Sequence, residues 1–389
     1  MLKVLEFVRV LDRGGVETFI FNNLREMDRT DMDISFLVTR NVIEPHEETV
    51  ISLGCNKVVV ELKFQNIQVL KQIERLVKMI LFFRKNHYDV IHFHSIGPYL
   101  NSSIAILAAK IGRIPVRIIH SHIAIPDELM TNSQKIKRKI GWFLNSRLGT
   151  HFVACSDLAA KYAYPPKLAD KVIYIKNAAN TEKFFYSEAI RNKVRSQIGI
   201  KDEILLGSVA RLAKFKNHDF MLKIINLLCK EEYKFKYKLI LIGGEIEDEP
   251  DVKNDIESFI NKNGIESSVI MYGQSNKVAE LLNAIDIVLM PSQYEGYPIV
   301  GIEAQCTGVK LIASDTITKE LRVTENCYFI SNNNAYEWID KIVQLSEEID
   351  SKDYNRKDMR EYIKSQGFDT KITAKQLNDL YHDINGENF

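Results

Sequence analysis

The chain has 389 residues, of which 46% are hydrophobic and 26% charged; this length exceeds one ordinary core and predicts two domains, or three. Five widely spaced cysteines without a C-x-x-C pair argue against a zinc site or a disulfide framework and indicate a reducing cytoplasm. The net charge is +1, but residues 1–180 carry 25 Lys and Arg against 17 Asp and Glu, so they net +8 and the remainder nets −7. This asymmetry indicates either an anionic surface as partner of the first half or ordinary variation of surface charge.

The N-terminal apolar run contains Lys3, Glu6 and Arg9, so it predicts a first core strand rather than a signal peptide. No stretch offers the roughly 18 apolar residues of a membrane-spanning helix. We therefore expect a cytoplasmic protein that is at most peripheral on the inner face of the cell membrane.

Short apolar runs alternate with amphipathic segments, and this alternation restarts after a polar stretch near 177–200. The predicted strands are 3–10, 33–39, 58–62, 89–95, 116–122, 151–156 and 171–177, then 203–212, 237–245, 268–273, 284–292, 309–314 and 327–331. The pattern predicts an α/β fold of two doubly wound, Rossmann-like domains that face a cleft. The domains are expected at 1–180 and 181–367, with a C-terminal helix, about 368–389, packed back on the first.

Ligands of open α/β sheets bind beyond the carboxyl ends of the strands, so the loops there are candidate sites. The stretch "PSQYEGYPIVGIEAQCTG" (291–308) leads from a strand into a helix that is predicted to begin at Pro298. Glu295 precedes this helix and Glu303 lies one to two turns into it, roughly 8 Å further along. The two carboxylates are expected either to bind a hydroxyl-rich ligand such as a ribose or hexose, or to cap the helix and lie on its flank.

Two further loops follow predicted strands. "GSVARLAKFKNHDF" (207–220) places Arg211 and Lys216 in one loop, which suits a diphosphate but also an ordinary solvated surface. "DRGGVETF" (12–19) places Gly14 and Gly15 at a helix start, where the backbone can approach a ligand or simply form a tight turn. Because this is not G-x-G-x-x-G, a dinucleotide site is weakly supported.

Four histidines, His92, His94, His120 and His122, end two predicted strands, and alternation places the members of each pair on one face. No acidic residue is interleaved with them, so we predict no metal site. At least one is expected to hydrogen-bond substrate, and the others to be satisfied core residues.

The segment 132–150 reads as a basic amphipathic helix with Trp142 as a candidate interfacial anchor. It suits an anionic membrane surface, or else packs its apolar stripe on the sheet and leaves a solvated basic face. The apolar residues at helical spacing are Ile136, Ile140, Phe143 and Leu144.

Together these stretches resemble the family 4 retaining glycosyltransferases of the GT-B fold, of the bacterial capsule and exopolysaccharide type. Residues 291–308 resemble the family's E-x7-E signature. "ARLAKFKN" resembles its Arg-Leu…Lys-Gly phosphate motif, with Asn217 in place of Gly. Three further motifs follow the family's order: "RGGVE" resembles its Gly-Gly loop, "KNAANTEKF" (176–184) its Asn-Gly-hydrophobic-Asp…Phe segment with Ala178 and Asn180 in place of Gly and Asp, and "SDTITKE" (314–320) its late motif.

The resemblance implies an enzyme that moves a hexose or N-acetylhexosamine from a nucleotide diphosphate sugar, UDP-linked, to a glycan or polyprenyl-linked saccharide. It implies no metal or other cofactor, and no nucleic acid is expected as partner. A nucleotide-sugar epimerase on the same fold and a non-catalytic nucleotide-sugar-binding subunit are the alternatives.

The resemblance also implies residue roles. Arg211 and Lys216 would hold the donor diphosphate, Glu303 the ribose and Glu295 the sugar, and His122, in preference to His120, would bind near the sugar hydroxyls. His122, Glu295, Arg211 and Lys216 are the catalytic candidates. The other donor-side candidates are Gly14, Gly15, Tyr272, Gly273, Gly296, Tyr297, Pro298, Ile299 and Val300, and the acceptor-side candidates are His94 and His120.

Overall fold

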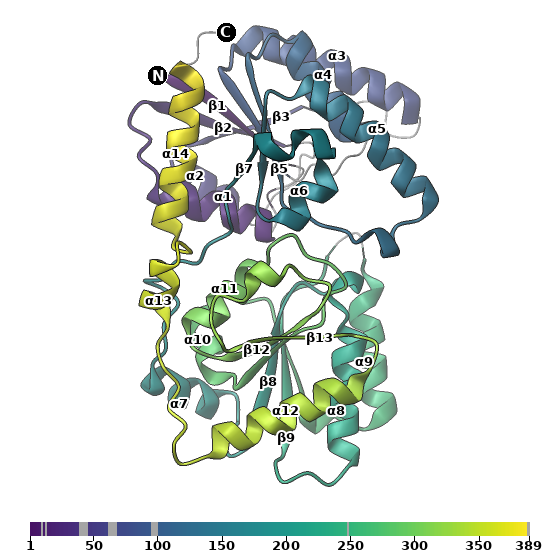
Figure 1. Cartoon of the computed structure of the whole chain (residues 1–389), viewed down its shortest axis with the longest axis vertical. Helices are drawn as coiled ribbons and strands as arrows, with labels where there is room; N and C mark the ends of the chain where they lie inside the picture. The colour runs from purple at the N-terminus through teal and green to yellow at the C-terminus, as the bar shows by residue number, and fades with distance from the viewer. Residues whose placement is uncertain are drawn as a thin grey trace. The chain divides into compact units, whose positions relative to one another are not determined.

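A computed structural model of the chain describes residues 1–8, 11, 14–38, 46–60, 68–94, 100–246 and 249–386. The chain divides into two compact units, residues 1–177 with 370–389 and residues 178–369, and each is built on one parallel sheet flanked by helices (Figure 1). The predicted α/β class with two doubly wound, Rossmann-like domains is therefore confirmed, and a strand is present in every segment where the sequence predicts one.

The first unit holds a seven-stranded sheet in the order β3-β2-β1-β4-β5-β6-β7. Its strands are β1 (Leu2–Phe7), β2 (Met32–Val38), β3 (Asn56–Val59), β4 (Val90–Phe93), β5 (Val116–Ser121), β6 (His151–Ala154) and β7 (Val172–Tyr174). Its helices are α1 (Gly15–Glu26), α2 (Glu47–Ser52), α3 (Gln68–Asn86), α4 (Leu100–Ile111), α5 (Asn132–Leu148), α6 (Asp157–Ala163) and α14 (Thr370–Gly386), with short 3-10 helices at Asp127–Leu129 and Pro166–Lys171.

The central strands β1, β4 and β5 are buried on both faces, which explains their continuous apolar runs. The C-terminal helix α14 packs against α1, where the Thr373 hydroxyl donates a 2.8 Å hydrogen bond to the buried Asn23 side chain. The end of the chain thus completes the core of the unit that begins it.

The second unit holds a six-stranded sheet in the order β10-β9-β8-β11-β12-β13. Its strands are β8 (Ile204–Val209), β9 (Tyr237–Ile242), β10 (Val269–Gly273), β11 (Ile287–Met290), β12 (Lys310–Ser314) and β13 (Cys327–Ile330). Its helices are α7 (Glu188–Gln197), α8 (His218–Lys230), α9 (Asp251–Asn263), α10 (Val278–Ala284), α11 (Ile299–Cys306), α12 (Ala335–Asp350) and α13 (Arg360–Ser365), with 3-10 turns at Lys214–Lys216, Glu266–Ser268 and Lys319–Leu321.

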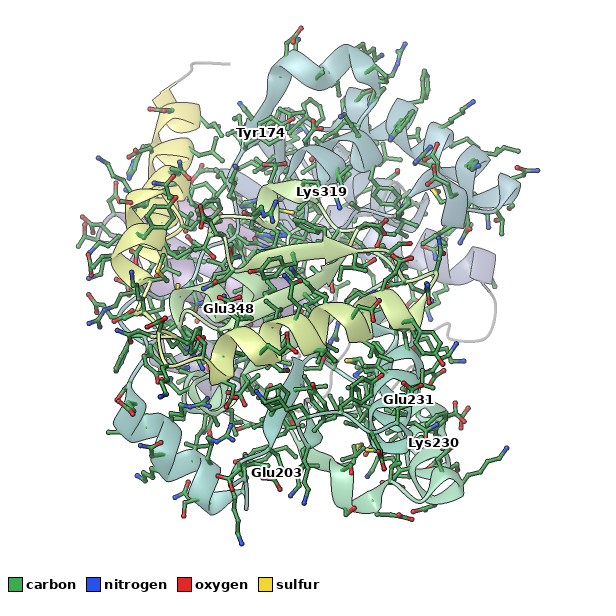
Figure 2. All side chains as sticks on the ribbon, turned by 60° about the horizontal axis from the view of Figure 1, so that its bottom comes forward. Tyr174, Glu203, Lys230, Glu231, Lys319 and Glu348 are labelled. Atoms are coloured by element: carbon green, nitrogen blue, oxygen red, sulfur yellow. The ribbon has the colours of Figure 1, made fainter. Side chains whose placement is uncertain are left out.

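Ion pairs close the amino ends of the second sheet. Glu348 of α12 pairs with Lys310 at the start of β12, and Glu203, just before β8, pairs with Lys238 of β9 at 3.2 Å. Glu348 and Glu203 are labelled in Figure 2. These ion pairs neutralise charges at the amino ends of the strands. The sequence predicts ligand binding at the opposite, carboxyl ends. Within the described residues, no helix has both the length and the apolar character needed to cross a bilayer.

Candidate functional site

The loops after β8 and β11 contact each other at the carboxyl ends of two neighbouring parallel strands. The Gln293 N–H donates to the Phe215 carbonyl at 2.8 Å, and the Asn217 side-chain amide donates to the Pro291 carbonyl at 3.2 Å. The structure therefore brings together two motifs that lie about 80 residues apart in the chain.

Asn217 has φ 60° and ψ 46°, the left-handed conformation, immediately before α8. Glycine adopts this conformation without strain, and asparagine is the residue that tolerates it next best. The departure from the family's usual glycine therefore preserves the turn that carries the two predicted cations.

Lys216 forms an ion pair with Glu295, and both side chains are mostly buried. The Lys216 ammonium also lies 5.0 Å from the centre of the Phe215 ring, which stacks on Tyr294. Glu295 is thus a partner of the cationic loop and does not cap α11, whose N-cap is Pro298 without a side-chain cap. The capping alternative is wrong for this residue.

Glu303 lies inside α11 and is only 8% exposed. Burial raises the pKa of its carboxyl to about 7, although Lys183 opposes that rise. Among the residues that the structure describes, none donates a hydrogen bond to this carboxylate. A buried acid in this condition can accept hydrogen bonds from a hydroxyl-bearing ligand. Lys183, within the "KNAANTEKF" segment, was not predicted as its neighbour.

The helix that carries Glu303 is anchored by Gln305, a residue that the sequence analysis missed. Its fully buried side chain donates to the carbonyls of Gly301 at 3.0 Å and Leu321 at 2.8 Å. Its oxygen accepts hydrogen bonds from the backbone of Val323 and from Thr324. A lone buried amide leaves no periodic signal in the sequence, so this anchor appears only in the structure.

The start of α11 corrects one detail of the prediction. Pro298 has ψ 114° and is the N-cap, so the helix begins at Ile299, with Val300 second. The buried Tyr297 side chain donates to the Glu320 carbonyl at 3.0 Å and stacks on Phe368. The Tyr297 side chain is therefore engaged within the protein, and the predicted ligand contact of this residue is left to its backbone.

Tyr272 and Gly273 end β10, which β9 separates from β8. Tyr272 is exposed, and the Gly273 carbonyl accepts a 2.9 Å hydrogen bond from the N–H of Gly243. A Cβ atom on Gly243 would lie 1.8 Å from the carbonyl oxygen of Ala210, so only glycine fits beside the residue that precedes Arg211. In the sequence, the run "IGGE" (242–245) is the signal for this close backbone approach.

In the first unit, Gly14 is the N-cap of α1, and its carbonyl accepts hydrogen bonds from the N–H and hydroxyl of Thr18. A Cβ atom on Gly15 would meet no described residue within 4 Å, so packing against the described part of the chain does not require glycine there. Asp12 and Arg13 of the same motif lie outside the described residues.

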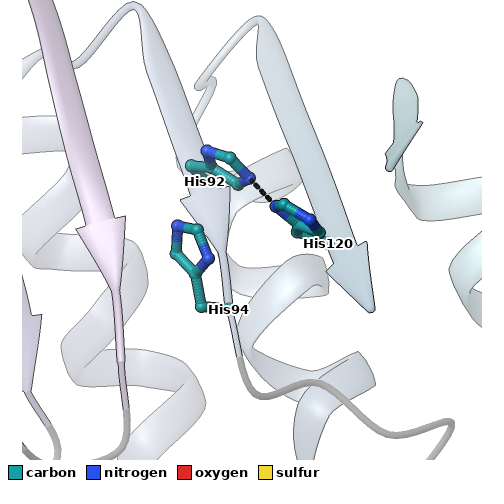
Figure 3. Close-up of side chains that lie close together, drawn as sticks. All are labelled: His92, His94 and His120. Carbon is teal, nitrogen blue, oxygen red and sulfur yellow. Dashed lines mark hydrogen bonds between the residues drawn. The ribbon is translucent and has the colours of Figure 1, made fainter. Parts of the chain in front are cut away.

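The four histidines form one cluster at the ends of β4 and β5. Figure 3 shows three of them, His92, His94 and His120. The ring nitrogens of His92 and His120 are 3.2 Å apart, and those of His94 and His122 are 2.9 Å apart. His92, His94 and His120 are fully buried, and His122 is half-buried. Burial lowers the pKa of His92, His120 and His122, which favours neutral rings.

No acidic residue is interleaved with these histidines in the sequence, but the fold places Glu6 of β1 among them. One Glu6 oxygen is 2.8 Å from His94, and the other accepts a 2.7 Å hydrogen bond from Tyr381 of α14. Tyr381 in turn lies 2.7 Å from His92. Parallel neighbouring strands bring Glu6 beside His92 in register, a relation that no local motif reveals.

Nitrogens of His92, His94 and His120 all lie within 4.8 Å of one another, a spacing that three ligands of one transition metal can approach. However, the closest nitrogens of His92 and His120 are already joined by a hydrogen bond (Figure 3). The residues therefore fit a hydrogen-bonded network directly, whereas a metal would have to replace that bond.

Helix α5 presents an exposed apolar stripe, so the alternative that this stripe packs on the sheet is wrong for three of the four residues. The predicted interfacial anchor Trp142 is engaged within the protein instead: its indole N–H donates to the Tyr162 carbonyl at 2.9 Å, and Arg138 lies over its ring. The exposed apolar residues are Ile136 (61%), Ile140 (50%) and Phe143 (55%).

Comparisons with known proteins agree with this geometry. Residues 13–183 match the family described as Glycosyltransferase Family 4, and residues 190–366 match that described as Glycosyl transferases group 1. EpsF of Bacillus subtilis (strain 168) is 28% identical over 82% of this chain and 80% of its own length. The capsular polysaccharide biosynthesis glycosyltransferase CapH of Staphylococcus aureus is 22% identical over 98% of this chain and 99% of its own.

The crystal structure of Anabaena Alr3699/HepE in complex with UDP-glucose superposes with a TM-score of 0.80 at 17% identity, covering 98% of this chain and all of that one. At this identity the likeness establishes the fold, and the two family matches extend over both units. The chain therefore belongs to the family 4 glycosyltransferases of the GT-B fold, and it is a glycosyltransferase of polysaccharide biosynthesis.

Proposed function

We propose that the protein transfers a hexose or N-acetylhexosamine from a UDP-sugar to a glycan or polyprenyl-linked saccharide, with retention of configuration. The contact between the loop of Arg211 and Lys216 and the loop of Glu295 carries this proposal. This contact brings a loop with two cations, which would hold a diphosphate, beside a carboxylate that would bind a sugar, next to the helix that carries Glu303.

Names of similar proteins support the choice of donor and acceptor. A relative from Escherichia coli, 23% identical over 82% of both chains, is named UDP-Gal:alpha-D-GlcNAc-diphosphoundecaprenol alpha-1,3-galactosyltransferase. The HepE structures contain UDP, UDP with glucose, or UDP-glucose. A UDP-sugar and a lipid-linked saccharide are the corresponding proposals for this chain.

The proposed chemistry follows from charge. A nucleotide diphosphate leaves as an anion, so Arg211, Lys216 and the first turn of α11 would stabilise the negative charge that develops on it. Glu295 would accept hydrogen bonds from the sugar and Glu303 from the ribose, and neither would transfer a proton. The acceptor hydroxyl would attack from the face that the diphosphate leaves. No metal is required in this scheme, so turnover should survive EDTA.

The test is a panel of nucleotide sugars assayed with Arg211→Ala and Lys216→Ala. Each substitution removes charge-assisted hydrogen bonds of about 1.5–3 kcal/mol, so kcat/KM should fall by roughly 10- to 150-fold. Lys214→Ala is the matched control, because this exposed cation lies in the same 3-10 turn. Near-normal turnover in both active-loop variants would refute the assigned roles.

The same panel separates the alternatives. An epimerase would isomerise the nucleotide sugar without any acceptor, and a binding subunit would retain the donor without turning it over.

We further propose that α5 docks on an anionic membrane surface, where a lipid-linked acceptor would lie. Beside its exposed apolar stripe, α5 carries Lys137, Lys139 and Arg147, all exposed. Helix α3 adds a second exposed stripe, and it packs on α4, which packs on α5. That stripe consists of Leu70, Ile73, Val77 and Leu81. Apolar side chains among basic ones suit a headgroup surface.

Vesicle sedimentation tests this docking. Vesicles with anionic lipid should retain the protein at low salt, whereas Ile136→Asn with Ile140→Asn should release it. Ile51→Asn, which changes an exposed isoleucine of α2, is the matched control. Failure of anionic vesicles to retain the native protein would refute the membrane role and leave the transferase proposal standing.

A further inference from the structure

Two buried ring nitrogens at the end of β5 have no hydrogen-bond partner within the described part of the chain. They are Nδ1 of His122 and Nε2 of His120. Each of the other six ring nitrogens of the cluster lies within hydrogen-bonding distance of another polar atom. An unpaired buried polar atom costs about 1–3 kcal/mol, so two of them together call for a specific explanation.

One branch of the network runs from Glu6 through His94 to His122. A carboxylate only accepts, so Nε2 of His94, 2.8 Å away, must donate to it. A neutral imidazole carries one proton, so Nδ1 of His94 is an acceptor and receives Nε2–H of His122 at 2.9 Å. This leaves Nδ1 of His122 without a proton.

The other branch runs from Glu6 through Tyr381 and His92 to His120. The Tyr381 hydroxyl donates to Glu6, so its oxygen accepts Nδ1–H of His92 at 2.7 Å. Nε2 of His92 then accepts Nδ1–H of His120 at 3.2 Å. This leaves Nε2 of His120 without a proton.

The two nitrogens at the ends of these branches therefore carry a lone pair and no proton, and neither has a hydrogen-bond partner among the described residues. We propose that Glu6 is a positioning residue that fixes the tautomers of His122 and His120, so that both present a lone pair to a hydroxyl group of the sugar substrates. Only the identity of that hydroxyl group rests on the proposed transferase function. The tautomers follow from the network for an ionised Glu6 and neutral imidazole rings, independently of that function.

Nitrogen-15 NMR of the imidazole rings tests the tautomers without any substrate. The chain has nine histidines, which single substitutions can assign. We expect Nε2–H for His94 and His122, and Nδ1–H for His92 and His120. An Nδ1–H tautomer of His122, or an imidazolium at His94, would overturn the proposal.

Two variants test the dependence on Glu6. In Glu6→Gln the amide can accept in one branch but must donate in the other, so the tautomers of one branch should invert. Tyr381→Phe is the matched change, because it interrupts only the branch to His120 and should leave His94 and His122 as they were. Unchanged tautomers in folded Glu6→Gln would overturn the role of Glu6. If Glu6→Gln does not fold, the spectra of the native protein and of Tyr381→Phe still decide whether the proposed tautomers are present.

Kinetics supply the functional readout. A Glu6→Gln variant should bind UDP as before, because the proposed UDP contacts lie in the other unit, and lose about tenfold or more in kcat/KM for transfer. Equal losses in UDP binding and transfer would indicate a merely structural role and overturn the positioning role. Absence of transferase activity in the native protein would refute the proposed function but leave the tautomer test intact.

Discussion

The buried carboxyl of Glu303 should make stability depend on pH near neutrality. Its pKa is raised from 4.5 to about 7 by burial, with Lys183 opposing the shift. Between these values the folded protein holds a proton that the unfolded chain releases, so the free energy of unfolding falls as pH rises from about 4.5 to 7. The contribution is fully present below pH 4.5 and is lost above pH 7.

The magnitude follows from the difference between the two pKa values. At about 1.4 kcal/mol for each pKa unit, ionisation of Glu303 costs the fold up to about 3 kcal/mol at pH 8. For a unit of this size, 1 kcal/mol shifts Tm by about 2–4 °C, so the effect reaches roughly 6–12 °C. Glu303→Gln removes the ionisation, and any cost of burying its amide is independent of pH.

The assay is thermal unfolding of native protein and Glu303→Gln at pH 5 and pH 8. The native protein should lose more stability than the variant between these two values, by an amount approaching the figure above. UDP should also bind the native protein more tightly as pH rises through 7, because ribose hydroxyls would stabilise the ionised carboxyl, and the variant should lack this trend. Identical pH dependences of stability in the two proteins would refute the reasoning.

Three further predictions concern the neighbouring loops. Glu295→Gln frees Lys216 from its ion pair, so UDP should bind about 5- to 30-fold tighter by calorimetry, a gain of about 1–2 kcal/mol, while sugar transfer slows. Weaker UDP binding by this variant would contradict the prediction. Gln305→Ala should lower the free energy of unfolding in urea by about 3 kcal/mol, whereas the exposed Gln293→Ala should be neutral. Asn217→Gly keeps the turn but loses the hydrogen bond to Pro291, so it should cost about 1 kcal/mol. Asn217→Val loses the same bond and adds backbone strain, so it should cost about 1–2 kcal/mol more, and equal Tm values for the two variants would count against the left-handed turn.

The alternation of strands and helices could be predicted from sequence because each strand is a short, buried apolar run. Parallel strands need crossover connections, so the order of elements constrains the topology strongly. The details that failed are at the ends of elements. Pro298 was placed inside its helix and is the N-cap, since its ψ of 114° is not helical.

The site was less predictable, because its contacts join residues far apart in the chain. The loop of Lys216 and that of Glu295 could be proposed to converge, since both follow strands of one sheet. Their ion pair, and the anchoring of α11 by Gln305, depend on side-chain directions that spacing does not encode. The helix α14 was expected to pack on the first domain, but no sequence pattern ties Tyr381 to the histidines of β4 and β5.

Two of the buried acids, Glu6 and Glu303, have opposite surroundings, and this difference connects the two proposals. Glu6, 1% exposed, accepts hydrogen bonds from Tyr381 and His94, so both of its oxygens already have donors. In our proposal Glu6 acts on a ligand only through the tautomers of the histidines. Glu303 accepts no hydrogen bond from the described residues, so its carboxyl oxygens are available to a donor from a ligand. One carboxylate thus organises the protein's own acceptors, whereas the other is suited to receive the hydroxyls of a ligand.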